Sequence, residues 1–243
     1  MRAALAEVHR RGFDQLVILG DLLSYGPDVD EVLDLVADEV ARGARLLYGN
    51  HEEIYLEPDS DYARHLSPMM RECAEWVRAR LDPSRLREMP FERDVQLEGV
   101  WFSHANPWGD WTYLNGLGDH RRAADVLLAR GFHVGVFGHT HRGKIVTMPD
   151  GTGVDEEHAH AAIWEPGEGR CLVLNAGSVG QPRNRAAQPT FLMLHHIDDA
   201  WHAQLSLLEY DVDAHVVALS QLPLSAPTRA RLIAFHHARV WSQ

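Results

Sequence analysis

The chain has 243 residues, of which 45% are hydrophobic and 24% charged, and its formal net charge is −12. This length suits one large domain with a substantial core. The acidic balance, without any run of Lys or Arg, argues against a general nucleic-acid surface. No apolar run approaches the ~18 residues of a membrane span, and no signal peptide is visible, so we expect a cytoplasmic protein without a membrane partner.

The first part of the chain alternates helices and strands. Asp28 or Asp30 can cap the second helix, and Gly43 can end it. This β-α-β winding predicts parallel strands joined by a right-handed crossover. The predicted elements are helix Arg2–Arg11, strand Asp14–Leu19, a helix over residues 29–40 and strand Arg45–Tyr48.

The rest of the chain mixes strands and helices. Glu52–Glu88 is predicted to be mostly helical, and Pro149–Arg170 to be a loose segment rich in Gly, Glu and His. Cys73 and Cys171 lie in apolar surroundings, which favours buried thiols over a disulfide. The pattern predicts an α/β fold with two stacked sheets and helices outside. The other predicted elements are strands Asp94–Leu97 and Val100–Ser103, helix Asp119–Arg130, strands Phe132–Phe137, Lys144–Met148, Cys171–Asn175, Thr190–His195 and Gln204–Tyr210, and helices Val212–Gln221 and Thr228–Val240.

Five short polar segments carry most of the functional information. Each of the first four follows a strand-like apolar run, and loops at the carboxyl ends of strands are where open α/β sheets gather ligand sites. One carboxylate, one amide and up to four imidazoles can therefore meet, a donor set that suits Mn, Fe or Zn. The segments are Gly20-Asp21, Gly49-Asn50-His51-Glu52, Ser103-His104, Gly138-His139-Thr140-His141 and Asn175-Ala176-Gly177-Ser178.

Each of these residues also has an ordinary structural interpretation. Asp21 can be a turn or cap residue, and Asn50 a turn residue in the left-handed region. An isolated His104 or His139 is more often structural or exposed. The series of four segments in order, each behind an apolar run, favours metal ligands over these alternatives.

The order and spacing resemble the calcineurin-like metallophosphoesterases from Met1 to about Leu222. The family pattern is D-x-H, G-D, G-N-H-[DE], an H after S, and G-H-x-H, and the last four blocks are present here. The residues around Gly20 and the segment 175–184 look most like a small bacterial phosphodiesterase branch. The resemblance implies a four-layer α-β-β-α sandwich with mixed sheets, as a single domain over residues 1–243 with a helical insertion at about 53–90.

The resemblance also implies a reaction and the residues that perform it. The family hydrolyses a phosphodiester or phosphomonoester by attack of a metal-activated water, so we expect a small phosphorylated substrate and two divalent ions (Mn, Fe, Zn or Ni). In the family pattern, His141 and the bridging Asp21 belong to one ion, and His51 stands near the leaving-group oxygen as proton donor or charge stabiliser. A hydrogen-bonding role behind the ligands is the alternative for His51. The ligands of the other ion are Asp21, Asn50, His104 and His139.

The family's first block, D-x-H, does not occur. The chain begins within what resembles the family's first helix, so we expect on the order of 15 further residues before Met1; a true loss of the block is the alternative. Only Asp21 and His141 are then visible for one ion, while the other is well ligated. A metal-binding regulatory relative with weak or no catalysis is therefore the alternative function, and a structural domain with relic motifs is a third.

Several residues bear on the substrate. Tyr25 and Tyr48 stand where Ser/Thr protein phosphatases carry phosphate-clamping arginines, which disfavours that branch. Arg183 can contact phosphate, although a structural role is the simpler interpretation of most of its loop. Trp108 can stack a base, with core or lid packing as the alternative. Glu52 is expected to be solvated or an acid in the first turn of a helix. The number of subunits is left open.

Overall fold

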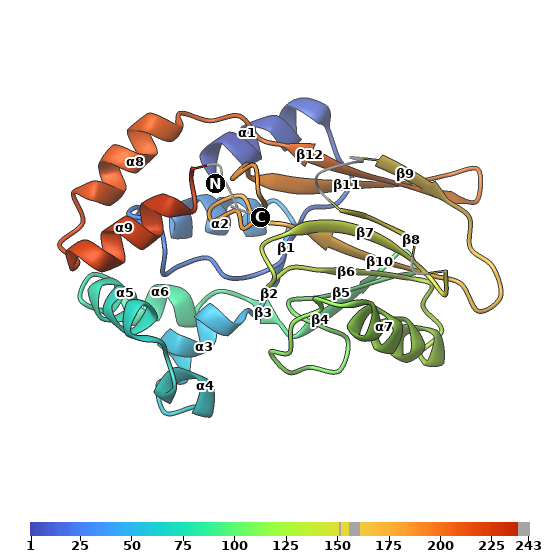
Figure 1. Cartoon of the computed structure of the whole chain (residues 1–243), viewed down its shortest axis with the longest axis horizontal. Helices are drawn as coiled ribbons and strands as arrows, with labels where there is room; N and C mark the ends of the chain where they lie inside the picture. The colour runs from blue at the N-terminus through green and yellow to red at the C-terminus, as the bar shows by residue number, and fades with distance from the viewer. Residues whose placement is uncertain (151, 156–160, 238–243) are drawn as a thin grey trace, which may run out of the picture. The chain divides into compact units, whose positions relative to one another are not determined.

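The computed structural model describes residues 1–150, 152–155 and 161–237 (Figure 1). They form two compact units, the first made of Met1–Glu92 with Glu209–His237 and the second of Arg93–Leu208. The mixed α/β class expected from the sequence is confirmed. The organisation as a single domain stays a prediction.

The first unit contains a small parallel sheet in the order β1-β2-β3. Parallel pairing of the first two strands around a helix confirms the predicted winding, whereas the short β3 was not predicted. The elements of this unit are α1 (Arg2–Arg11), β1 (Val17–Ile18), α2 (Val29–Ala41), β2 (Arg45–Leu47), α3 (Asn50–Leu56), α4 (Asp61–Arg64), α5 (Pro68–Arg78), α6 (Pro83–Arg87), β3 (Phe91–Glu92), α8 (Val212–Ser220) and α9 (Ala226–Ala234).

The predicted helical stretch Glu52–Glu88 consists of several short helices because capping residues interrupt it. Ser60 accepts the Ala63 N–H, and Ser67 accepts the Met70 N–H, in each case at the start of a helix. Apolar faces of these helices and of α2 share one core with β2. Leu33, Val36, Leu46, Ile54, Ala74, Val77 and Leu86 are each at most 1% exposed in it.

The second unit contains a six-stranded mixed sheet, in the order β4-β5-β6-β10-β7-β8, and a three-stranded antiparallel sheet, in the order β11-β12-β9. Within the larger sheet, β5, β6 and β10 are parallel neighbours. The elements are β4 (Asp94–Leu97), β5 (Val100–Ser103), α7 (Leu117–Ala129), β6 (Val134–Phe137), β7 (Gly143–Met148), β8 (Thr152–Asp155), β9 (Ala161–Trp164), β10 (Cys171–Ala176), β11 (Thr190–Ile197) and β12 (Ala200–Leu207).

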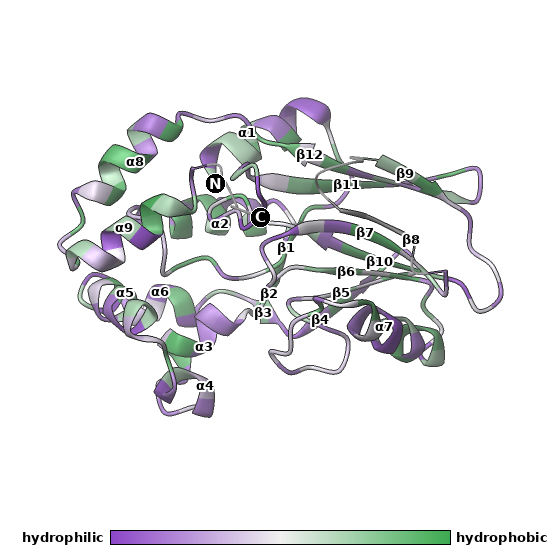
Figure 2. Cartoon of the chain, in the orientation of Figure 1, coloured by the Kyte–Doolittle hydropathy of each residue, from purple (hydrophilic) through white to green (hydrophobic). Residues whose placement is uncertain are grey.

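Helix α7 and the small sheet lie on opposite sides of the six-stranded sheet (Figure 1). Leu127 of α7 packs so closely on this sheet that a Cβ added at Gly135 would lie 2.6 Å from its Cδ1. On the other side, a Cβ added at Gly143 would lie 3.1 Å from Leu205 of β12. Figure 2 shows the helix carrying both hydrophilic and hydrophobic residues, as one buried face requires.

Some predicted boundaries were wrong. The loose segment predicted over Pro149–Arg170 contains β8 and β9, and the strand predicted over Asp14–Leu19 is confined to β1. The helix predicted over Thr228–Val240 is α9, which begins and ends earlier; residues 238–240 of that prediction lie outside the described residues. No helix in the described part of the chain combines the length and apolar composition needed to cross a membrane.

Candidate metal centre

Asp21 follows β1 and occupies an unusual backbone conformation. Its φ is +56°, which L-residues other than Asn, Asp and Gly rarely adopt. Its Oδ1 accepts the backbone N–H of His51 at 3.0 Å. Side chains held in such regions often belong to functional sites, because the surroundings must hold them there.

Two glycines allow the loops after β1 and β2 to touch. A Cβ added at Gly49 would lie 2.5 Å from Asp21 Oδ1 and 2.8 Å from Glu52 Oε2, and one added at Gly20 would lie 2.7 Å from the Gly49 nitrogen. No side chain fits at either position without backbone movement. The glycines of the G-D and G-N-H segments thus bring the two loops into direct backbone contact.

Asn50 and His51 open helix α3, and each is 2% exposed. The Asn50 side-chain nitrogen donates to the Tyr62 hydroxyl at 2.6 Å, which assigns the other end of the amide as the oxygen. His51 Nδ1 lies 2.9 Å from the carbonyl oxygen of Leu23. A carbonyl only accepts, so Nδ1 carries a proton, and in the neutral ring the lone pair is on Nε2.

Glu52 is neither solvated nor exposed, which corrects one of the two expectations for it. The residue is 0% exposed, and its carboxylate accepts the N–H groups of Asp21, Leu22 and Gly49, each at 2.8 Å. The other expectation is confirmed, since Glu52 lies in the first turn of α3. The sequence signal that reveals this role is an acid three residues after the N-cap position, as in a capping box.

In the second unit, His104 and His139 come together. They follow β5 and β6, which are parallel neighbours, so the two loops leave the same edge of the sheet. The ring centroids are 5.2 Å apart, and the residues are 3% and 4% exposed. The Gly138 N–H donates to the carbonyl oxygen of His104 at 2.8 Å and ties the loops together.

Backbone carbonyls also orient the two histidines of the G-H-x-H segment. His139 Nε2 lies 2.9 Å from the Trp111 carbonyl oxygen, and His141 Nδ1 lies 3.0 Å from that of Gln181. The lone pair of the neutral ring is therefore on Nδ1 of His139 and on Nε2 of His141. Metal-binding histidines typically donate their other N–H in this way. Both residues have positive φ, +62° and +59°.

The loop after His104 is organised by a residue that the sequence did not single out. Asn106 is 2% exposed, and its amide donates to the carbonyls of Asp110 and Thr112 at 2.8 and 2.9 Å. These bonds flank Trp111, whose carbonyl holds His139. Tyr113 stacks on the His139 ring at 4.1 Å between centroids. Asn106 could have been found only as one more polar residue close to a predicted ligand.

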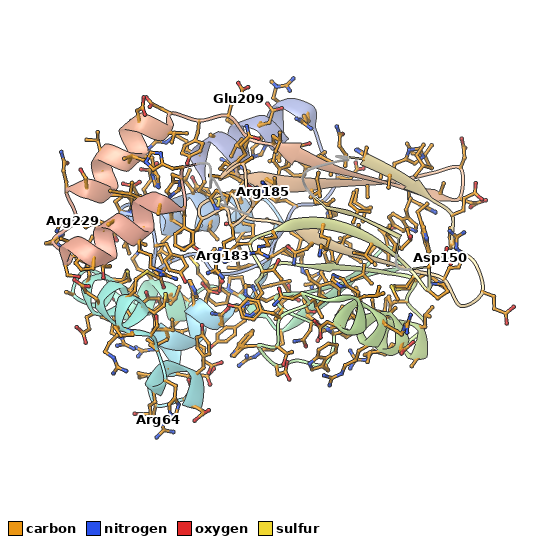
Figure 3. All side chains as sticks on the ribbon, in the orientation of Figure 1. Arg64, Asp150, Arg183, Arg185, Glu209 and Arg229 are labelled. Carbon is orange, nitrogen blue, oxygen red and sulfur yellow. The ribbon has the colours of Figure 1, made fainter. Side chains whose placement is uncertain are left out.

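Trp108 and Arg183, the two residues predicted to contact substrate, both have protein partners. The guanidinium of Arg122 lies 3.8 Å from the Trp108 ring centroid, and the indole N–H donates to Asp110. Arg183 lies in the loop between β10 and β11 (Figure 3). Its backbone N–H donates to the His141 carbonyl oxygen at 3.0 Å, so this loop supports the G-H-x-H segment.

The donor chemistry suits a divalent first-row ion. The first unit offers the carboxylate of Asp21 and the oriented amide oxygen of Asn50, and the second offers oriented imidazole nitrogens. Oxygen and imidazole ligands of this kind are typical of Mn, Fe and Zn sites. The two cysteines are free and buried, as expected, and burial raises their pKa values to about 11 for Cys73 and about 12 for Cys171.

Comparisons with known proteins agree with this chemistry. An uncharacterized protein of Methanocaldococcus jannaschii is 24% identical over 222 residues, which cover 87% of this chain and 83% of that protein. A metallophosphoesterase from Sphaerobacter thermophilus superposes with a TM-score of 0.75 at 19% identity, covering 96% of this chain and 93% of that chain. A hypothetical protein from Pyrococcus horikoshii superposes with a TM-score of 0.72 at 11% identity, covering 98% and 92%.

These two structures show that the fold is that of a metallophosphoesterase. The family model of the calcineurin-like phosphoesterase superfamily domain matches residues 1–199. The chain therefore belongs to the calcineurin-like phosphoesterase superfamily.

Proposed function

We propose that this protein is a metal-dependent hydrolase of a small phosphodiester or phosphomonoester. Family membership supports the reaction class. The observation that carries the proposal for this chain is the orientation of its histidines. In His51, His139 and His141, a backbone carbonyl accepts one ring N–H and so determines which nitrogen faces the other way.

The proposed ligands are those expected from the motif order. Asp21, Asn50, His104 and His139 hold one divalent ion, and Asp21 shares a second ion with His141. Bound divalent ions supply a water of lowered pKa and stabilise negative charge on the phosphoryl oxygens. The polypeptide contributes the fixed direction of each donor, which it achieves with backbone hydrogen bonds and closely packed glycines.

His51 is the proposed proton donor to the leaving group. Its Nδ1–H is held by Leu23, so Nε2 is the nitrogen that delivers a proton to the leaving oxygen. The ring also contacts the edge of Tyr25, with centroids 4.8 Å apart. This packing in a buried position limits rotation of the imidazole and keeps its direction constant.

Arg183 is the proposed phosphate contact. Its Nε donates to the side-chain oxygen of Gln181 at 3.1 Å, which holds the guanidinium beside the carbonyl that orients His141. Trp108 is proposed to border the substrate, although Arg122 already covers one face of its ring. A planar group on the substrate would therefore use the opposite face or the edge.

The alternative function is a metal-binding regulatory relative with little or no catalysis. It is favoured by one observation, the absence of D-x-H, which leaves Asp21 and His141 for the second ion. Turnover distinguishes the two functions, while metal binding alone does not. A structural domain with relic motifs would show neither.

The test uses the full chain, stripped with chelator and reloaded with Mn²⁺. Turnover of bis-p-nitrophenyl phosphate is compared with that of p-nitrophenyl phosphate, with His139→Asn as the inactive control. We expect Mn²⁺-dependent hydrolysis of at least one substrate that His139→Asn loses. Tight Mn²⁺ binding without turnover of either substrate supports the regulatory alternative, and neither binding nor turnover refutes both.

A further inference from the structure

The carboxylate of Glu52 joins the two loops that carry the proposed oxygen ligands. Its Oε2 accepts the N–H groups of Asp21 and Gly49, and its Oε1 accepts the N–H of Leu22, all at 2.8 Å. Asp21 and Leu22 belong to the loop after β1, and Gly49 belongs to the loop after β2. One buried side chain therefore bridges two segments that are about thirty residues apart in sequence.

Such an arrangement is more than a helix cap. A carboxylate that is fully removed from water is costly unless hydrogen bonds satisfy it. Hydrogen bonds to a charged acceptor are roughly twice as strong as neutral ones. A capping interaction within α3 involves only the Gly49 N–H, whereas two of the three donors belong to the other loop. The extra donors connect Glu52 to the backbone of a proposed metal ligand.

We propose that Glu52 is a positioning residue that sets the spacing between the Asp21 carboxylate and the Asn50 amide, and thereby the affinity for the divalent ion. Asp21 has a positive φ, a conformation that persists only when the surroundings hold it. Glu52 holds it through the Asp21 N–H, while the same oxygen fixes Gly49, the residue directly before Asn50. The inference rests on the proposed metal-dependent function.

Substitution by Gln separates this role from simple packing. Glutamine has nearly the same shape but only one acceptor oxygen, so at least one of the three N–H groups would face an NH₂ group. Glu39 provides a matched control in the same unit. It is 3% exposed, and its carboxylate accepts from His9 and Arg42 side chains rather than from a ligand loop.

The experiment compares the full-length wild type with Glu52→Gln and Glu39→Gln. Mn²⁺ affinity is measured by calorimetry and by the EPR signal of free ion, and stability of the metal-free proteins by urea unfolding. We expect Glu52→Gln to weaken Mn²⁺ binding by about 10- to 100-fold, the usual effect of removing a residue that supports a ligand. Glu39→Gln should keep wild-type affinity even where it loses stability.

Wild-type affinity in Glu52→Gln, or equal losses of affinity in both variants, would overturn the proposal. So would a wild type that binds no Mn²⁺. If Glu52→Gln does not fold, amide hydrogen exchange of the metal-free wild type decides instead. Strong protection of the Asp21, Leu22 and Gly49 amides is expected, and rapid exchange at Asp21 and Leu22 overturns the proposal. Affinity is independent of turnover, so an inactive protein that binds Mn²⁺ refutes the proposed catalysis but leaves this inference standing.

Discussion

His51 Nδ1 lies 2.9 Å from the carbonyl oxygen of Leu23, and the imidazole is 2% exposed. Leu23 belongs to the loop after β1, whereas His51 lies in the first turn of α3. The ring direction is therefore set by the backbone of a neighbouring loop and not by a side-chain partner. A substitution that keeps the ring's neighbours can consequently test its chemistry without dismantling the loop.

Replacing His51 by Asn is expected to reduce kcat by about 10²- to 10⁴-fold, the usual contribution of a positioned proton donor. Mn²⁺ affinity should remain within about twofold of wild type, because a proton donor is not a ligand. Steady-state kinetics and calorimetry on the same preparations measure the two quantities. Loss of Mn²⁺ binding together with activity would instead assign His51 to the metal site.

Replacing His139 by Asn should abolish tight Mn²⁺ binding. Losing a hydrogen-bonding partner behind a ligand already costs about 10- to 100-fold in affinity, and loss of the ligand itself should cost at least as much. His133 provides the control, since it is also in the second unit and donates Nδ1–H to a carbonyl, that of Arg170, at 2.9 Å. His133→Asn with the same affinity loss as His139→Asn would contradict the ligand assignment.

Replacing Gly49 by Ala should destabilise the protein by about 1–3 kcal/mol or more, the usual effect of overpacking. The added methyl would meet Asp21 Oδ1 at 2.5 Å and the Asp21 nitrogen at 2.7 Å, so the ligand loop must move. Gly26→Ala is the matched control, because a Cβ there meets nothing within 4 Å. Urea unfolding measures both. Equal stability of the two variants would show that the loops separate easily.

Acid should destabilise the protein through His236. Burial, together with the neighbouring His215 and His237, lowers the His236 pKa to about 4 from its ordinary 6.5, and Tyr210 lies 2.7 Å from its Nδ1. Because the folded pKa is below the unfolded value, the unfolded state takes up this proton first as pH falls. The free energy of unfolding should decline from about pH 6.5 to about pH 4.

Urea unfolding across this pH range, with His236→Gln for comparison, measures the effect. The variant should lose part of the acid dependence, since Gln does not titrate. His215 has a lowered pKa of its own, mainly through burial, and retains a share. An unchanged slope in the variant would show that other groups cause the acid sensitivity.

The positions of the proposed ligands could be predicted because they depend on local pattern. Apolar runs such as Val134–Phe137 form buried strands, and a polar residue directly after such a strand lies at its carboxyl end. The parallel pairing of β5 and β6 then brings His104 close to His139 without any further sequence information. Helix Arg2–Arg11 and strands Asp94–Leu97 and Val100–Ser103 were predicted with their observed bounds.

Other features depend on contacts that no local pattern encodes. Glu52 is buried because two loops meet around it, and Asn106 matters because its partners flank Trp111. Strand β9 was missed because its surroundings are rich in Gly and Glu, and the strand is defined by pairing with β12. Tertiary pairing overrides weak local preference in such segments.

The central claim is that Asp21, Asn50, His104 and His139 bind the same ion. The most direct measurement is anomalous diffraction at the manganese edge from crystals of the full chain grown with Mn²⁺. The account predicts an anomalous peak with an oxygen of Asp21, the amide oxygen of Asn50 and a ring nitrogen of each histidine at about 2.0–2.3 Å, the usual range for first-row ions. A peak bound by other residues, or no peak at saturating Mn²⁺, would contradict it.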